Sequence, residues 1–342
     1  MRFAVVGFGY WGRHYVRLLH QRPDVRLTFV ADPSPRALAE AEVVARGART
    51  TASPHEALTS DEVDAVVIAT PATTHFELTR LALRSGKDVL CEKPLSTAVD
   101  ECQELIRTAE TAGQTLFVGH TFLYSPAIRE AKRLLVEHEL GHSVHAHASW
   151  AAPGPVRSDV NALWDLAPHP LSILTYLLER QPTSVTATGQ AILAGGREDV
   201  VFLHLRFDDL ATADVHLSWL APRKARTLTL TGDRRLVVFD DSATHAKLQV
   251  FDMSVVNAGS TGDGSDPRSL FLPAEPVHVP VIDASEPLAE QLAHFVESCV
   301  RRTGSQQHAL AGVDVVRILE AGQSSLVDGG RPVELPAVAR AA

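Results

Sequence analysis

The first 120 residues alternate short apolar runs with stretches of helical periodicity. Because the runs are apolar at nearly every position, they favour parallel strands covered by helices on both faces. The pattern predicts strands at residues 3–6, 27–31, 48–51, 65–69, 89–91 and 116–118. Helices are expected at residues 11–22, 35–46, 74–85 and 97–112, and a further one is expected to begin at the capping-box sequence of residues 53–56.

After residue 120, apolar and polar positions alternate along the predicted strands, which is typical of an antiparallel sheet with one open face. Strands are expected at residues 184–192, 200–207, 213–219, 226–231, 236–239 and 248–251. Helices are expected at 127–139, after the prolines at 168 and 170, at 287–302 and at 312–325, and a loop at 257–268. The expected α/β protein has a first domain at 1–120. An α+β domain at 121–342, with an open-faced, mostly antiparallel sheet, is expected to bind substrate and mediate oligomerisation.

Composition narrows the choice of partners and compartment. The formal net charge of −9, from 32 basic and 41 acidic residues among 342, disfavours nucleic acid or an anionic membrane as a partner. Cys91, Cys102 and Cys299 have no CxxC spacing, so neither a disulfide framework nor a zinc site is expected. The first residues lack the features of a signal peptide, and no apolar stretch approaches the ~18 residues of a membrane span. A cytoplasmic location is therefore expected.

A glycine motif follows the first predicted strand and opens the first predicted helix. Its glycines would allow a tight turn, close approach of a pyrophosphate and close helix packing, and the helix N-terminus would present N–H groups to the phosphates. Asp32 ends the second strand, where a carboxylate can bind the adenosine ribose and repel a 2′-phosphate, so NAD is favoured over NADP. The alternative is a glycine turn and a helix-capping aspartate in an unrelated α/β domain. The domain at 1–120 is therefore expected to be an NAD-binding Rossmann domain with a doubly wound parallel sheet. The cofactor-binding candidates are Gly7, Phe8, Gly9, Tyr10, Trp11, Gly12 and Asp32.

Glu92-Lys93-Pro94 lies at the carboxyl end of the fifth predicted strand, the edge at which open α/β sheets bind ligands. A lysine there can polarise a carbonyl or alkoxide oxygen beside a nicotinamide ring. The alternative is a surface ion pair between Glu92 and a basic neighbour.

Asp165 and His169 form a second candidate pair. A neutral imidazole, with an unperturbed pKa near ~6.5, can take a proton from a sugar hydroxyl. Pro168 and Pro170 lack N–H groups, so a helix is expected to begin close to His169. The alternative makes Asp165 a helix cap and His169 a satisfied local hydrogen-bonding group.

These motifs resemble the glucose–fructose oxidoreductase and inositol dehydrogenase family, often called Gfo/Idh/MocA. The resemblance covers nearly the whole chain and rests on the glycine motif, Ile68-Ala-Thr-Pro71 with His75, Glu92-Lys93-Pro94 and Asp165-Leu-Ala-Pro-His169. It implies tightly held NAD or NADP, hydride transfer at a sugar or cyclitol carbon, an active-site Lys93, and a proton-transfer motif, D-x-G-x-H, matched by Asp165 and His169. It also implies a cofactor-side role for Thr70, Pro71, His75, Glu92 and Lys93.

The glycine motif and residues 164–169 look most like the branch of the family that oxidises nucleotide-linked N-acetyl sugars at C3. Two positions depart from the pattern. Ala167 replaces the glycine of D-x-G-x-H, and Pro170 stands where that branch often has an aspartate, which removes a sugar-hydroxyl acceptor.

Two other groups of residues carry candidate chemistry. His120 and Tyr124 follow the last Rossmann strand and could contact substrate or nicotinamide, with interdomain packing as the alternative. His142, His145 and His147 form H-x-x-H-x-H, but no third ligand stands near the two that would share a strand face. A polar sheet face is therefore favoured over a metal site, and no metal is expected. For His75 the alternative is a first-turn helix residue on a solvated face.

The sequence thus predicts an NAD(H)-dependent oxidoreductase that transfers hydride at a secondary alcohol or ketone of a nucleotide- or phosphate-linked sugar. Lys93, His169 and Asp165 are the catalytic candidates, and His120 and Tyr124 complete the substrate-binding candidates. Reduction of a non-sugar ketone or imine, or non-catalytic NAD sensing, are the alternatives. A homodimer or homotetramer is expected, because an open sheet face leaves apolar area for an interface.

Overall fold

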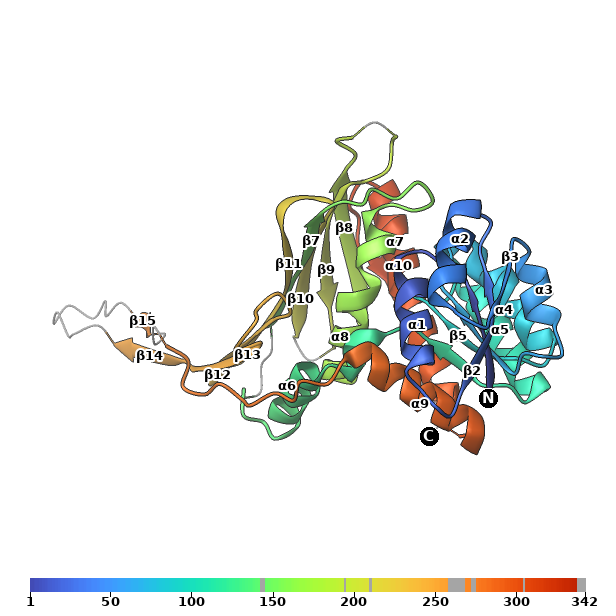
Figure 1. Cartoon of the computed structure of the whole chain (residues 1–342). Coiled ribbons are helices and arrows are strands. Elements are labelled where there is room, and N and C mark those ends of the chain that lie inside the picture. Colours follow the sequence, from blue (N-terminus) through green and yellow to red (C-terminus); the bar gives the residue numbers. More distant parts are fainter. Residues whose placement is uncertain are drawn as a thin grey trace. The chain divides into compact units, whose positions relative to one another are not determined.

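The computed structural model describes residues 1–141, 145–193, 195–208, 211–257, 268–271, 275–303 and 305–336. The chain folds into two compact units (Figure 1). The first unit comprises Met1–Thr121, Ser158–Val160 and Glu286–Glu320, and the second comprises Phe122–Arg157, Asn161–Ser285 and Ala321–Ala342. None of the helices among the described residues combines the length and apolar character needed to cross a membrane.

The first unit contains a parallel sheet of six strands with the order β3-β2-β1-β4-β5-β6. This is the Rossmann order, in which the direction of winding reverses between β1 and β4 and creates a ligand-binding crevice at the carboxyl ends of the strands. The predicted parallel sheet is therefore confirmed. Its strands are β1 (Arg2–Val6), β2 (Arg26–Ala31), β3 (Arg49–Thr51), β4 (Ala65–Ile68), β5 (Asp88–Cys91) and β6 (Leu116–Val118).

The helices between these strands also follow the prediction within a few residues at their ends. They are α1 (Tyr10–His20), α2 (Pro35–Val44), α3 (Pro54–Thr59), the 3₁₀ turn η1 (Ala72–Thr74), α4 (His75–Arg84) and α5 (Val99–Ala112). The predicted capping box before α3 is wrong. Ser53 makes no side-chain capping bond, and Glu56 instead accepts a hydrogen bond of 2.5 Å from the Thr51 hydroxyl, because β3 ends close to the helix start.

Helix α9 (Pro287–Arg301) belongs to the core of the first unit although it lies near the other end of the chain. Leu288 and Phe295 are buried in one cluster with Phe3, and the rings of Phe3 and Phe295 meet edge-on with centroids 6.2 Å apart. The expected boundary at residue 120 assigns this helix to the second domain, whereas its packing places it in the first unit.

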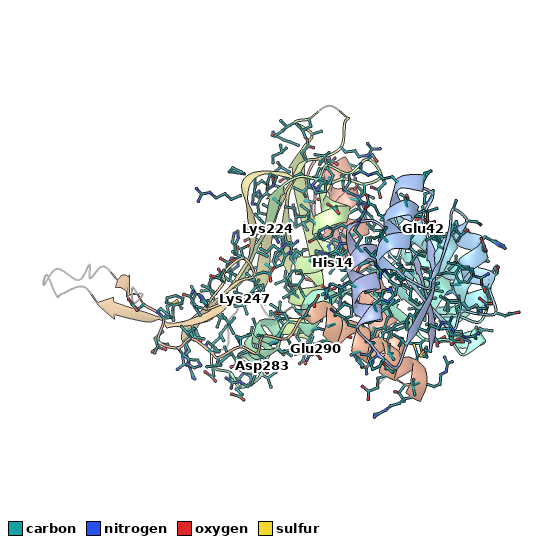
Figure 2. The ribbon with its side chains drawn as sticks, in the orientation of Figure 1. His14, Glu42, Lys224, Lys247, Asp283 and Glu290 are labelled. Carbon is teal, nitrogen blue, oxygen red and sulfur yellow. The ribbon has the colours of Figure 1, made fainter. Side chains whose placement is uncertain are left out.

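The second unit contains a mixed sheet of eight strands with the order β13-β12-β11-β7-β10-β9-β8-β16. All neighbouring pairs are antiparallel except β7 and β10, which confirms the mostly antiparallel prediction. The long strand β11 carries Lys224 (Figure 2). The strands are β7 (His145–Pro153), β8 (Ser184–Gln190), β9 (Val200–Arg206), β10 (Thr212–Ser218), β11 (Leu220–Thr231), β12 (Arg235–Asp240), β13 (Leu248–Asp252) and β16 (Val333–Glu334).

The predicted loop at 257–268 lies between β14 (Ser254–Asn257) and β15 (Arg268–Phe271), which pair as a separate antiparallel ribbon. Residues 258–267 lie outside the described residues. The helices of the second unit are η2 (Thr121–Tyr124), whose first residue belongs to the first unit, α6 (Pro126–Val136), α7 (Ala162–Leu166) and α8 (Pro168–Leu178). Helix α10 (Ser305–Val327) begins in the first unit and ends in the second.

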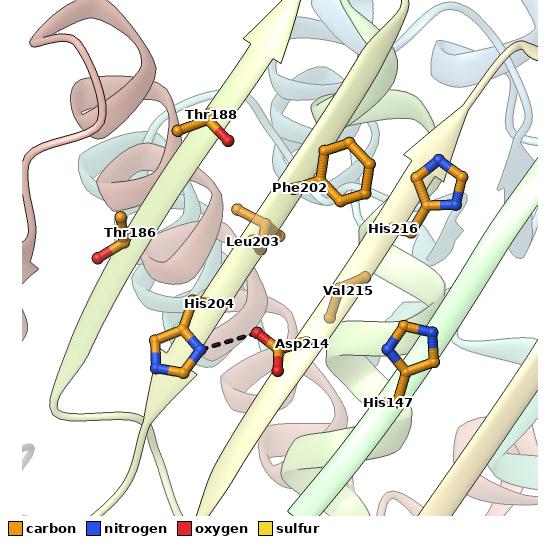
Figure 3. A pocket seen from close by; sticks show the side chains of 9 residues that line it. All are labelled: His147, Thr186, Thr188, Phe202, Leu203, His204, Asp214, Val215 and His216. Carbon is orange, nitrogen blue, oxygen red and sulfur yellow. Dashed lines mark hydrogen bonds and ion pairs between the residues drawn. The ribbon is translucent and has the colours of Figure 1, made fainter.

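One face of the eight-stranded sheet is buried beneath helices and the other is open. On β7 the buried side chains are Ala146, Ala148 and Trp150, whereas His145 and His147 are exposed. Figure 3 looks onto the open face, with helices visible behind the sheet. The predicted open-faced sheet is therefore confirmed.

Candidate active site

The glycine motif forms the turn between β1 and α1. Gly7 has a φ of +92° and donates its N–H to Ala31 across 2.8 Å, which closes the turn against β2. A Cβ at Gly12 would lie 1.9 Å from the Gly7 carbonyl oxygen, so only glycine allows α1 to approach this closely. A Cβ at Gly9 would meet no atom within 4 Å, so open space borders the loop there. These three conditions fit the phosphate-binding turn that the motif predicts.

The aromatic residues of the motif differ in their surroundings. Phe8 is buried, and the Arg13 guanidinium lies 4.8 Å from its ring centroid. Tyr10 is 73% exposed and meets Trp11 edge-on at 5.4 Å. Phe8 therefore contributes packing, while Tyr10 offers an exposed ring at the start of α1.

Asp32 follows β2 and holds the glycine loop. Its Oδ2 accepts the Phe8 N–H at 2.7 Å, and its Oδ1 accepts the Ser34 N–H at 2.8 Å. The alternative that Asp32 caps a helix is wrong, because Ser34 is the N-cap of α2 and accepts the Ala37 N–H. The carboxylate thus stands beside the turn that would hold a pyrophosphate, as expected for a group that meets the adenosine ribose.

Asp32→Ser is expected to lower the preference for NADH over NADPH by about tenfold or more, because one charge-assisted hydrogen bond contributes about 1.5–3 kcal/mol. Both affinities should also weaken somewhat, since the Phe8 N–H loses its acceptor. Fluorescence titration with each dinucleotide measures the ratio. Asp24→Ser removes the same charge from a surface ion pair with Arg22 and should leave the ratio unchanged. Equal or tighter binding of NADPH by the unaltered protein would contradict the assignment.

His75 joins the segments that follow β4 and β5. Its Nδ1 lies 2.7 Å from the Pro94 carbonyl oxygen and its Nε2 lies 3.0 Å from that of Thr70. The ring is only 1% exposed, so the alternative of a solvated helix face is wrong. Pro71, in the segment that follows β4, is exposed and precedes η1. His75 therefore holds the segment containing Lys93 in place rather than presenting a group to solvent.

Glu92 is buried at the end of β5, immediately before Lys93. Its Oε1 accepts a hydrogen bond of 2.8 Å from the Tyr15 hydroxyl, and its Oε2 accepts the Lys93 N–H at 3.2 Å. Burial raises the pKa of Glu92, and the Lys93 charge and the Tyr15 bond oppose that rise. The alternative of a surface ion pair is wrong because the residue is only 4% exposed. Glu92 thus forms a buried support beneath the strand end from which Lys93 leaves.

His120 follows β6, the neighbour of β5, and is 3% exposed. Neither ring nitrogen has a hydrogen-bond partner among the described residues. Burial, together with the charges of His308 and Lys93, lowers the pKa of His120 to about 3. A neutral imidazole with two unsatisfied nitrogens is costly unless water or a ligand completes it, which favours a binding role over simple packing.

In the second unit, Asp165 lies within α7 and His169 lies in the first turn of α8. The Trp219 indole N–H donates to Asp165 Oδ2 at 2.9 Å. The alternative that Asp165 caps a helix is wrong, since Asn161 is the N-cap of α7 and Ala167 that of α8. The His169 ring meets Phe122 edge-on at 5.2 Å. Both candidates are therefore held in position by aromatic side chains of their own unit.

Tyr124 is the last predicted site residue, and three further residues support the site without having been predicted. Tyr124 is buried, which raises the pKa of its hydroxyl, and the Arg129 guanidinium lies 5.3 Å from its ring centroid. Sequence reasoning missed Tyr15, Trp219 and Phe122. Tyr15 could have been found, because its hydroxyl lies on the buried face of amphipathic α1 and therefore needs a polar partner.

The histidines considered for metal binding lie on the open sheet face, except His142, which is outside the described residues. His145 contacts the Thr212 hydroxyl at 2.8 Å, and His147 lines a hollow of 360 Å³ with His204, Asp214 and other residues (Figure 3). Within the described part of the chain, no group of three or more His, Cys, Asp or Glu side chains could hold a metal ion.

Comparisons with known proteins agree with this geometry. The family model "Oxidoreductase family, NAD-binding Rossmann fold" matches residues 1–120, and the "GFO/IDH/MocA C-terminal domain" model matches residues 128–238. Inositol 2-dehydrogenase 2 of Saccharopolyspora erythraea is 31% identical over 64% of this chain and 66% of that protein. The matches span 58% to 66% of the length of the first curated relatives.

Solved structures match over most of the chain. GenD2 of gentamicin A biosynthesis, in complex with NAD, is 27% identical over 98% of this chain and 97% of its own, with a TM-score of 0.81. UDP-N-acetylglucosamine 3-dehydrogenase GnnA of Acidithiobacillus ferrooxidans is 23% identical over 95% and 97%, with a TM-score of 0.78, a likeness that concerns the fold.

Proposed function

Because this chain belongs to the Gfo/Idh/MocA family of oxidoreductases, we propose that it transfers hydride between NAD(H) and a secondary alcohol or ketone of a sugar or polyol. One observation carries the proposal. Lys93 and His120 follow the adjacent parallel strands β5 and β6, on the same sheet edge as the glycine turn after β1. In this strand order a dinucleotide bound across the switch point between β1 and β4 extends toward β5.

The residues of the first unit fit the dinucleotide. The open space at Gly9 admits a close approach to the backbone, and α1 presents its N-terminal N–H groups there. The Asp32 carboxylate suits the ribose hydroxyls of NAD. The ring nitrogens of His120, which have no hydrogen-bond partner in the described part of the chain, offer hydrogen bonds near Lys93. When bound, NAD supplies the acceptor for hydride.

The chain's own residues would then handle the oxygen of the reacting alcohol. The Lys93 ammonium group donates a hydrogen bond to that oxygen and stabilises the negative charge that develops on it. The His169 imidazole accepts its proton, while Asp165, held by the Trp219 indole, orients the imidazole or binds a neighbouring hydroxyl. The Tyr124 hydroxyl, kept protonated by burial, is a further candidate for a substrate hydrogen bond.

We propose further that the sugar is nucleotide- or phosphate-linked. The motif at residues 164–169 supports this, through its likeness to the branch that acts on nucleotide-linked N-acetyl sugars. The departure at Pro170 alters the contacts to the sugar ring, so the sugar itself is the variable to test.

A substrate screen tests the activity. The protein is mixed with NAD⁺ and with myo-inositol, N-acetylglucosamine, N-acetylglucosamine 1-phosphate or UDP-N-acetylglucosamine, and absorbance is followed at the reduced-nicotinamide band. Reduction of NAD⁺ by at least one sugar or polyol is expected. Tight NAD binding without turnover on this panel or a wider set of sugars would favour a non-catalytic NAD sensor. Turnover restricted to non-sugar ketones or imines would favour a reductase of those compounds.

We also propose a homodimer or homotetramer that uses the open face of the second sheet. Phe202 is 52% exposed there and stacks on His216 with ring centroids 4.7 Å apart. Light scattering at micromolar protein should give two or four chains per particle. Phe202→Arg should yield monomers, whereas Val43→Arg, which changes an exposed valine on α2, should not. A monomer mass for the unaltered protein contradicts the proposal.

A further inference from the structure

The second unit carries a group of cationic side chains on and beside β11. Lys224 and Arg226 belong to β11, and Lys247 immediately precedes β13. Figure 2 labels Lys224 and Lys247. Within the described residues, the ion pairs of this group involve one carboxylate, Asp241, which lies 3.4 Å from Arg226 Nη1 and 3.4 Å from Lys247 Nζ. Three positive charges therefore share one negative charge, in a chain whose formal net charge is −9.

The positive charges are crowded. Partial burial lowers the pKa of Lys224, and Arg226 and Lys247 lower it further, against the opposing effect of Asp241. The 3.4 Å contacts of Asp241 exceed the ~2.7–2.9 Å of a strong charge-assisted hydrogen bond, so this carboxylate compensates its neighbours only in part. The group is therefore suited to receive an additional anion.

Arg226 also links this group to the candidate proton acceptor of the same unit. Its guanidinium carbon lies 5.7 Å from the centroid of the Phe122 ring, and the edge-on partner of that ring, at 5.2 Å, is His169. Arg226 and His169 thus contact the same ring. A sugar with its reacting hydroxyl at His169 could reach Arg226 with a charged substituent.

We propose that Lys224 and Arg226 bind a phosphoryl group of the substrate, so that the substrates are sugars with a phosphate or diphosphate substituent. This inference rests on the proposed function, because it assigns the anion to the molecule whose hydroxyl meets His169. The planar guanidinium can donate two parallel N–H bonds to phosphoryl oxygens. A phosphate monoester carries about −1.5 to −2 charges at pH 7, which matches the surplus of this group.

Calorimetric titration of the NAD-loaded protein tests the site without requiring turnover. The probes are N-acetylglucosamine, N-acetylglucosamine 1-phosphate and UDP-N-acetylglucosamine. At least one phosphorylated probe should bind more tightly than the neutral sugar. Arg226→Met and Lys224→Met should each weaken that binding by about 10- to 100-fold, as expected for loss of a charged hydrogen bond. Binding of the neutral sugar should change less than threefold.

Two further variants sharpen the test. Arg133→Met removes the same charge from α6, where Arg133 pairs with Glu130, and should leave all affinities unchanged. Arg226→Lys keeps the charge and should retain more phosphate binding than Arg226→Met, while circular dichroism checks that each variant is folded. If the Met variants lose more affinity for N-acetylglucosamine 1-phosphate, the site accepts a monophosphate. If they lose more affinity for UDP-N-acetylglucosamine, it accepts the diphosphate of a nucleotide sugar.

Three results would overturn the inference. These are the absence of any preference for phosphorylated probes, variants that bind them within twofold of the unaltered protein, and variants that lose neutral and phosphorylated probes equally. Phosphate-dependent binding without turnover of any sugar would leave the site standing and overturn the proposed oxidoreductase activity instead.

Discussion

Lys93→Met and His169→Ala are each expected to lower turnover by about 10²–10⁴-fold, the usual effect of removing a group that transfers a proton or stabilises the negative charge that develops on the substrate. The affinity for NADH should stay within about threefold of that of the unaltered protein. Neither residue is part of the glycine turn, and neither forms the hydrogen bond by which Asp32 holds that turn. Steady-state rates on the substrate found in the screen, together with fluorescence titration of NADH, measure both quantities.

Lys87→Met is the matched control for Lys93→Met. Lys87 immediately precedes β5 at its opposite end and donates to the Ser60 carbonyl oxygen at 2.8 Å, away from the carboxyl edge of the sheet. Its loss should affect stability more than turnover. Near-normal turnover in His169→Ala would remove His169 from the proton-transfer role and leave Lys93 or Tyr124 as the next candidate. Loss of NADH binding in Lys93→Met would indicate a structural role.

The second large effect concerns acid stability. Burial lowers the pKa of His120 to about 3 and that of His308 to about 4, from an unperturbed value of 6.5. Below pH 6.5 these two histidines bind protons in the unfolded chain but stay neutral in the folded protein. The free energy of unfolding therefore falls as the pH drops from 6.5 toward the folded-state pKa values. At pH 5 each imidazole costs about 2 kcal/mol of the free energy of unfolding, or about 4 kcal/mol together.

Urea unfolding at pH 7 and pH 5 measures this loss. Between pH 7 and pH 5 the free energy of unfolding should fall by about 4 kcal/mol less in the double variant His120→Leu with His308→Phe than in the unaltered protein. The new phenylalanine can keep the stacking of His308 on Phe117, whose ring centroids are 3.9 Å apart. His55→Gln, a change at an exposed histidine on α3, should leave the pH dependence unchanged. An equal loss in the double variant would show that these imidazoles titrate normally.

Much of the fold follows from local patterns that the sequence displays directly. Strands such as β4 are apolar at every position, which identified a parallel sheet before any contact was known. The parallel pairing of β7 with β10 left no such sign, because an alternating strand presents the same pattern in either orientation. Helix α7 is five residues long, too short for a helical period to appear.

The sequence predicted a site residue where a reactive side chain directly follows a recognisable strand, as Lys93 follows β5. The supporting contacts depend on residues far apart in sequence. Tyr15 lies 77 residues from Glu92, and Trp219 lies 54 residues from Asp165, so no local pattern links either pair. For the same reason the sequence suggested an exposed ion pair at Glu92, whereas its carboxylate is buried.

The position of α9 determines when the nucleotide-binding unit can finish folding during synthesis. Phe3 and its neighbours are covered in part by Phe295, which the ribosome adds long after the six strands of the sheet. At about 5–20 residues per second, the segment between residues 121 and 286 takes roughly 10–30 s to translate. The apolar surface that α9 covers therefore stays exposed on the nascent sheet during this time, and a fragment ending at residue 120 should be prone to aggregate.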